Sequence, residues 1–176
     1  MSQHARNDSE VRAMFAVPLK NVVDYIVQKI WNENRAEIRV IVYEAYQPSS
    51  YNRTGDFQKA WDYSSKTNSI GDVVATGEFF YNPETMSLGS NDYQSDNYGQ
   101  HVSVVDGEDM RPYLAEIIYQ GLYGSAWKSN VQARDAWDRL LKVIGKRKMR
   151  QWLGEGMKRE GLKGTLHNAP IKVEYN

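Results

Sequence analysis

Three pairs of carboxylates stand close together in the chain, and paired carboxylates can serve as the acid and base of a catalytic site. The pairs are Glu108 and Asp109, Asp135 and Asp138, and Glu155 and Glu160. A catalytic carboxylate needs a cleft that shifts its pKa, whereas each of these pairs stands among other charged and polar residues. We therefore predict that all three pairs are solvated surface groups and that the chain has no catalytic residue.

The sequence lacks the residues and motifs that other kinds of catalysis, metal binding and nucleotide binding require. The chain has no cysteine, so disulfide frameworks, cysteine–zinc sites and thiol catalysis are excluded. The three histidines, His4, His101 and His167, are far apart and form no metal-binding spacing. No Gly-x-Ser-x-Gly elbow, phosphate loop or Gly-x-Gly-x-x-Gly motif occurs. We expect no metal, no cofactor and no nucleotide site.

Basic residues gather near the C-terminus. The densest group comprises Lys146, Arg147, Lys148 and Arg150. Such a group could contact phosphates, for example those of DNA that threads a channel. However, Lys and Arg total 22, as do Asp and Glu, so the formal net charge is zero, and a general nucleic-acid binder usually carries a basic excess. These four residues are therefore candidate DNA-facing residues, and a solvated helix face is the alternative.

The motif with the most local information ends at the second tryptophan, Trp61, and reads Tyr-Asn-Arg-Thr-Gly-Asp-Phe-Gln-Lys-Ala-Trp. Thr54 is a good helix N-cap, and Gly55 permits a tight turn. Phe57 and Trp61 then recur at helical spacing, which predicts a short helix over 55–63 with an aromatic face. We expect this face to lie in the core rather than at an interface.

This stretch resembles the (R)TG-x-(L/F)-x-x-(S/A)-(I/W) box of the tail-completion, or head–tail joining, proteins of long-tailed phages. The matching residues are Arg53, Thr54, Gly55, Phe57 and Trp61. A later element, Tyr-Leu-Ala-Glu-Ile-Ile-Tyr-Gln-Gly at 113–121, is similar to a Tyr-x-x-Glu-Ile-x-x-x-Gly element of that family. The chain departs from the family pattern at Asp-Phe and Ala-Trp, where Arg-Leu and Ser-Ile are commoner, and it lacks the usual Pro-Val-Asp lead-in.

The resemblance implies a structural virion protein, not an enzyme, located at the phage neck and made in the host cytoplasm. It implies a closed ring of the chain's own copies, commonly a hexamer, that joins the head connector to the tail tube. The implied partners are these copies, the head-side connector or portal proteins, the tail-tube protein and, by non-specific contact, DNA in the channel. No membrane partner is expected, since no run of residues is long and apolar enough to span a bilayer.

The elements that must position these residues follow from periodicity. Residues 1–12 are polar and expected to be flexible, and 13–176 are expected to form one domain. Apolar spacing predicts a helix over about 19–46, kinked near Asn34. The β-branched run at 38–43 would also suit a strand, and the family resemblance favours the helix.

Farther along, the sequence predicts one or two strands over 64–82, a long exposed loop over 84–100, and another strand over 100–105. A helix is expected over 111–121 and a long helix over 131–160, bent near Gly145 or Gly154 and stopped by Gly161. The predicted fold class is therefore α+β, with a small mostly antiparallel sheet packed by long N- and C-terminal helices.

Candidate subunit or partner contacts lie in the loop and at the C-terminus, namely at Tyr93, Tyr98, Ile171, Val173 and Tyr175. The last three alternate with charged residues and could add a strand to a sheet edge, in this subunit or the next. Two other function classes stay open. One is a small nucleic-acid-acting enzyme, a nuclease or toxin, that uses carboxylates and the basic helix. The other is an adaptor that binds a protein partner through aromatic residues.

Overall fold

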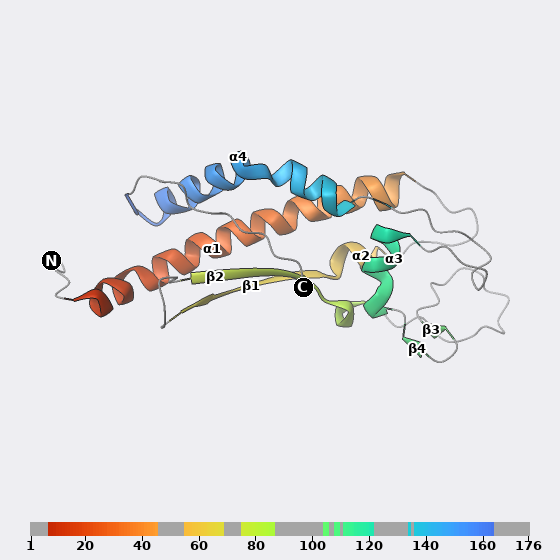
Figure 1. Cartoon of the computed structure of the whole chain (residues 1–176), viewed down its shortest axis with the longest axis horizontal. Coiled ribbons are helices and arrows are strands. Elements are labelled where there is room, and N and C mark those ends of the chain that lie inside the picture. The colour runs from red at the N-terminus through yellow and green to blue at the C-terminus, as the bar shows by residue number, and fades with distance from the viewer. Residues whose placement is uncertain are drawn as a thin grey trace. The chain divides into compact units, whose positions relative to one another are not determined.

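The computed structural model (Figure 1) describes residues 7–45, 55–68, 75–86, 104–105, 108–109, 111–121, 134 and 136–163. The chain divides into two compact units. The first comprises Met1–Ile30, Tyr63–Phe79 and Val143–Asn176, and the second Trp31–Asp62 and Phe80–Lys142. A two-stranded antiparallel sheet packs against long N- and C-terminal helices, so the predicted α+β class is confirmed.

Helix α1 (Asp8–Ile38) begins earlier than expected. The backbone N–H of Glu10 donates to the side-chain oxygen of Asn7 over 2.9 Å, and the Asn7 amide reaches back to the Glu10 carboxylate over 3.4 Å. The first of these bonds caps the helix by satisfying the backbone N–H of Glu10, and the second links the two side chains. Residues expected to be flexible are therefore helical from Asp8 onward, and Pro18 lies inside the helix rather than at its start.

The β-branched run after α1 is helical, as the resemblance favoured. It forms the π-helix η1 (Arg39–Glu44), in which the Ala45 N–H donates to the Val40 carbonyl over 3.1 Å. The α-helix continues through Asn34, near which a kink was expected. The irregularity comes at Arg39, where the hydrogen-bond spacing widens to five residues.

In the first unit, α1 lies between helix α4 (Ala136–Arg159) and the sheet of β1 (Trp61–Thr67) and β2 (Ala75–Tyr81) (Figure 1). Glycines permit both contacts. A Cβ at Gly77 of β2 would stand 2.6 Å from Val23 and Val27 of α1, and a Cβ at Gly156 of α4 would stand 3.1 Å from Val22. The buried apolar residues of this unit are Val22, Val27, Ile144 and Trp152.

Two features of α4 confirm the sequence prediction. The helix is broken at Gly145, whose φ of 42° and ψ of 165° are not helical. Its C-terminus closes with the Leu162 N–H donating to Met157 over 2.8 Å and the Gly161 N–H donating to Lys158 over 3.2 Å. These two hydrogen bonds, together with the left-handed residue Gly161 at φ 68°, make a Schellman motif.

Besides the end of α1, η1 and the start of α4, the second unit contains short elements. They are α2 (Asp56–Lys59), η2 (Pro83–Thr85), β3 (Val104–Val105), β4 (Glu108–Asp109), η3 (Arg111–Tyr113) and α3 (Leu114–Gln120). Strands β3 and β4 pair antiparallel, with Val104 opposite Asp109. Helix α3 ends at Gly121, as predicted. The first helix of this series is shorter than the expected 55–63, because the chain enters β1 at Trp61.

Candidate functional site

The box residues that the structure describes build a turn and a core. Gly55, not Thr54, stands at the N-cap of α2, and its φ of 75° lies in the left-handed region that glycine adopts without strain. Phe57 and Trp61 are both buried, so the prediction that they belong to the core is confirmed. Arg53 and Thr54 lie outside the described residues.

Trp61 is the centre of an aromatic cluster in the second unit. Phe57 meets it edge-on with ring centroids 6.1 Å apart, and Trp137 of α4 stacks on it at 6.2 Å. Tyr81 of β2 and Tyr119 of α3 contact it at 5.3 and 5.9 Å. Aromatic pairs of this geometry contribute roughly 0.5–1.5 kcal/mol each beyond area burial. The cluster therefore joins five elements through one side chain of the box.

Polar contacts tie the box to the end of α1. The Trp31 indole N–H donates to the Trp61 carbonyl over 2.6 Å, and the Gln58 amide donates to the Arg35 carbonyl over 2.7 Å. The Arg35 guanidinium lies over the Trp31 ring at 4.5 Å, within cation–π range. The box thus contacts the end of α1 both through the backbone carbonyl of Trp61 and through the side-chain amide of Gln58.

Arg134 holds the π-helical turn in place. Its Nη1 donates to the carbonyls of Ile41 and Val42 over 2.9 and 2.8 Å, and its backbone N–H donates to Ile118 over 2.8 Å. Carbonyls at the end of a helix lack intrahelical donors, so the Arg134 guanidinium supplies the missing hydrogen-bond donors. Nothing in the sequence near Arg134 signals this role, because its partners are about 90 residues away.

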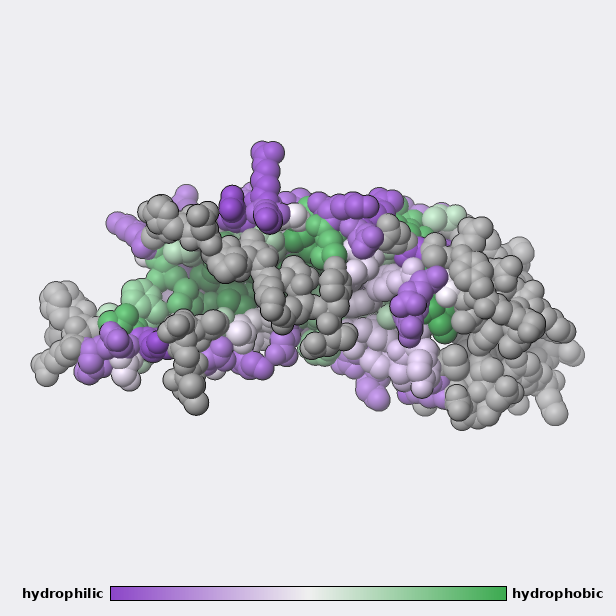
Figure 2. Space-filling view, in the orientation of Figure 1, coloured by the Kyte–Doolittle hydropathy of each residue, from purple (hydrophilic) through white to green (hydrophobic). Residues whose placement is uncertain are grey.

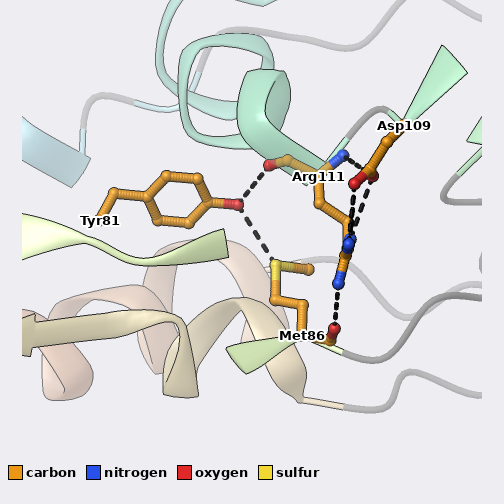
Figure 3. Close-up of polar contacts among 4 residues, drawn as sticks. All are labelled: Tyr81, Met86, Asp109 and Arg111. Atoms are coloured by element: carbon orange, nitrogen blue, oxygen red, sulfur yellow. Dashed lines mark hydrogen bonds and ion pairs between the residues drawn. The ribbon is translucent and has the colours of Figure 1, made fainter. Parts of the chain in front are cut away.

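A second polar cluster, drawn in Figure 3, surrounds Arg111. Its Nε donates to both oxygens of Asp109 at 3.0 Å, its Nη2 donates to one of them at 2.8 Å, and its Nη1 donates to the Met86 carbonyl at 2.7 Å. Bidentate guanidinium–carboxylate geometry of this kind is among the stronger polar contacts. The hydrogen bonds from Arg111 lower the pKa of Asp109, which is thus not the free solvated carboxylate that the sequence predicted.

Tyr81 links this cluster to the aromatic one. Its hydroxyl donates to the Arg111 carbonyl over 2.7 Å and also lies 3.2 Å from the Met86 sulfur. Burial raises the pKa of Tyr81 well above its ordinary value. The arrangement fastens η3, β4 and the chain after η2 to the end of β2.

The first unit contains an open polar cleft of about 500 Å³. It is lined by Asn21, Asp24, Tyr25, Gln28, Tyr63, Gly156, Arg159 and Glu160. Desolvation acts to raise the pKa of Asp24, but hydrogen bonds from Lys20 and Ser65 outweigh it, so that pKa is lowered. The lining carboxylate of Asp24 therefore stays ionised and engaged with its own neighbours.

Glu155 and Glu160, predicted to be solvated, fasten α4 to α1. The Tyr25 hydroxyl donates to Glu155 over 2.7 Å, and the Asn21 amide donates to Glu160 over 3.0 Å. Hydrogen bonds from Gln151 and then Tyr25 lower the pKa of Glu155. The Arg159 guanidinium covers the Tyr25 ring at 4.6 Å. Both carboxylates thus act as hydrogen-bond acceptors in a helix contact, which no local sequence signal indicates.

The candidate DNA-facing residues do not share one face. Lys146, Arg147 and Arg150 are exposed and fall within roughly 100° of one another around the helix axis. Lys148 is half-buried and lies 5.9 Å from the Trp152 ring. Three of the four basic residues therefore form one exposed patch after the break at Gly145, and the fourth packs against the helix itself.

The candidate contact residues Tyr93, Tyr98, Ile171, Val173 and Tyr175 lie outside the described residues. Within the described ranges, no three His, Asp or Glu side chains are grouped so that they could hold a metal ion. None of the helices that the structure describes has the length and apolar character needed to cross a membrane.

Comparison of the chain with protein-family models, with curated proteins and with solved structures found no match in any of the three.

Proposed function

We propose that the chain is a structural subunit of the phage neck, where copies of it form a ring between the head connector and the tail tube. The observation that carries the proposal is the role of the box residues. Gly55 shapes the turn, and Phe57 and Trp61 supply the core of the second unit. A short motif used for packing suits a protein whose task is association rather than catalysis, and this agrees with the resemblance.

The sheet offers a surface for such association. In the described part of the chain it has only two strands, so each strand presents one edge of backbone donors and acceptors to an incoming strand. Its outer side is polar, with Lys66 and Glu78 paired across the strands at 2.9 Å. Strand addition at an edge provides affinity through main-chain hydrogen bonds, which is a common mode of subunit contact.

Contact with channel DNA is part of the proposal through the exposed patch of Lys146, Arg147 and Arg150. Such contact would be non-specific and would weaken as salt rises, because it depends on phosphate neutralisation. Replacing the three residues with Gln should abolish salt-dependent binding of duplex DNA by the assembled ring. Replacing Lys148 alone, which packs near Trp152, is the matched control and should change binding much less.

The experiment that tests the assignment is mass measurement by light scattering over a concentration series, paired with negative-stain imaging. We expect closed rings of one stoichiometry to form as concentration rises. A strict monomer at every concentration, and also in the presence of a tail-tube protein encoded beside it, would refute the assignment. The genes that flank this one provide a second check, since portal, capsid and tail-tube genes should lie nearby.

A further inference from the structure

The first turns of α1 carry an exposed apolar stripe. Val11, Met14 and Phe15 are 41%, 39% and 41% exposed, and with Pro18 they recur at the spacing of one helix face. Val22, the next residue of that face, is only 1% exposed because it lies against Gly156 of α4. Figure 2 shows apolar surface gathered over this part of α1. The stripe is therefore the uncovered continuation of the α1–α4 contact.

The stripe is uncovered because α4 ends too soon. The two helices run antiparallel, since Tyr25 is hydrogen-bonded to Glu155, whereas Asn21, earlier in α1, is hydrogen-bonded to Glu160, just after the end of α4. Immediately after this last contact, the chain leaves the helix through the left-handed Gly161. Helix α4 thus ends near Asn21, ten residues along α1 from Val11.

The chain that follows α4 starts at this place. Residues 164–176, which lie outside the described part, could span about 40 Å when extended, whereas the ten residues of helix from Asn21 back to Val11 extend only about 15 Å. Their last residues alternate apolar and charged side chains. Ile171, Val173 and Tyr175 would fall on one side of an extended segment, and Lys172 and Glu174 on the other.

We propose that residues 164–176 lie along the stripe of Val11, Met14 and Phe15 in the same chain and complete the contact that α4 begins. Three observations lead to this occupant: the stripe continues an existing helix contact, α4 ends beside it, and the remaining chain has both the reach and an apolar side. The contact would form in a chain of any function, so it does not depend on the proposed neck assignment. This location on a helix differs from the sheet edge, in this subunit or the next, to which the sequence suggested that the segment could add a strand.

Disulfide trapping tests the contact, because the chain has no cysteine of its own. The test variant carries Phe15→Cys with Val173→Cys. The control carries Ala13→Cys with Val173→Cys, and Ala13 is exposed on the opposite side of α1. Under mild oxidation of dilute full-length protein, we expect the test pair to close at least tenfold faster than the control, within one chain. Equal rates would overturn the proposal, and a disulfide between chains would assign the segment to a neighbouring copy instead.

A second measurement needs no cysteine. Met14 reports on the cover directly, since a covered thioether reacts slowly with peroxide. Val173→Asp places a charge on the apolar side of the segment, and Lys172→Asp is the matched control on its other side. We expect Val173→Asp to raise the oxidation rate of Met14 severalfold, read by peptide mass, and Lys172→Asp to leave it near the wild-type rate. Equal Met14 oxidation in all three proteins would overturn the proposal.

Discussion

Two glycines of α4, two residues apart, should respond differently to the same substitution. A Cβ built on Gly154 has no atom within 4 Å other than those of its chain neighbours and its own helix backbone. A Cβ built on Gly156 meets the Val22 Cγ1 at 3.1 Å, the Val22 Cα at 3.4 Å and the Tyr25 Cδ1 at 3.4 Å. Both positions are inside the helix, so the backbone preference for alanine is the same at each. Only the packing against α1 differs between them.

The magnitudes follow from these distances. Alanine is favoured over glycine by about 1 kcal/mol in a helix interior, so Gly154→Ala should raise the free energy of unfolding by about that amount. At Gly156 the same gain is opposed by overpacking, which typically costs about 1–3 kcal/mol in a well-packed contact. The two contacts at 3.4 Å are ordinary van der Waals distances, whereas the Val22 Cγ1 at 3.1 Å must give by a few tenths of an ångström, and Val22 is buried. Gly156→Ala should therefore be about 1–3 kcal/mol less stable than Gly154→Ala.

Urea unfolding of the two variants and the wild-type chain, followed by circular dichroism, measures this difference. In a thermal melt, each 1 kcal/mol corresponds to a shift of about 2–4 °C for a chain of this size. Equal stabilisation by both alanines would contradict the prediction, because it would mean that α1 does not approach α4 at Gly156. Equal unfolding slopes are needed for the comparison, since a changed slope would signal a different denatured state.

Three further predictions each concern a single residue. Gly77→Ala should destabilise the chain by at least about 1–3 kcal/mol in urea unfolding, because its Cβ would stand 2.6 Å from two valine methyls, and a neutral effect would contradict the contact of β2 with α1. Asn34 is fully buried, and neither of its amide atoms has a hydrogen-bond partner among the described residues, so Asn34→Leu should stabilise by about 1–3 kcal/mol. A loss of stability in that variant would show that a polar group satisfies the amide. Burial raises the pKa of Tyr119, so above pH ~10 the unfolded chain releases a proton that the folded chain keeps, and stability should fall as pH rises. Tyr119→Phe should make the decline between pH 8 and pH 11 shallower, and an unchanged pH profile would count against burial of the hydroxyl.

The helical periodicity of α1 and α4 could be predicted from the sequence, and some of their ends could be as well. The stop at Gly161 and the break at Gly145 both follow from glycine, and the structure confirms them. The start of α1 was also readable, because Asn7 and Glu10 stand at capping-box spacing. The polar composition of residues 1–12 favoured a flexible segment, and only the capping residues indicate that a helix begins there.

The π-helical turn shows where local signals stop. Its β-branched composition favours a strand, and composition alone cannot decide the matter. In the structure, Arg134 donates to the carbonyls of Ile41 and Val42, which lack ordinary helical partners. The residue that stabilises the turn is thus remote in sequence, and no window of 10 or 20 residues around the turn contains it. Tertiary contacts override propensity at such positions.

The same limit applies to the box and to the carboxylates. Helical spacing correctly placed Phe57 and Trp61 together, but it also extended the helix through Trp61, whereas the helix ends at Lys59. The Asn82 N–H donates to the Ala60 carbonyl over 2.7 Å, so pairing with a distant segment starts where the helix would have continued. Likewise, Glu155 and Asp109 looked like free surface charges because their partners, Tyr25 and Arg111, had no recognisable pairing signal. Residue type and spacing identify which side chains will be buried or charged, and the fold decides which of them meet. For this chain, that division explains why its core motif was readable from the sequence while the contacts that position it were not.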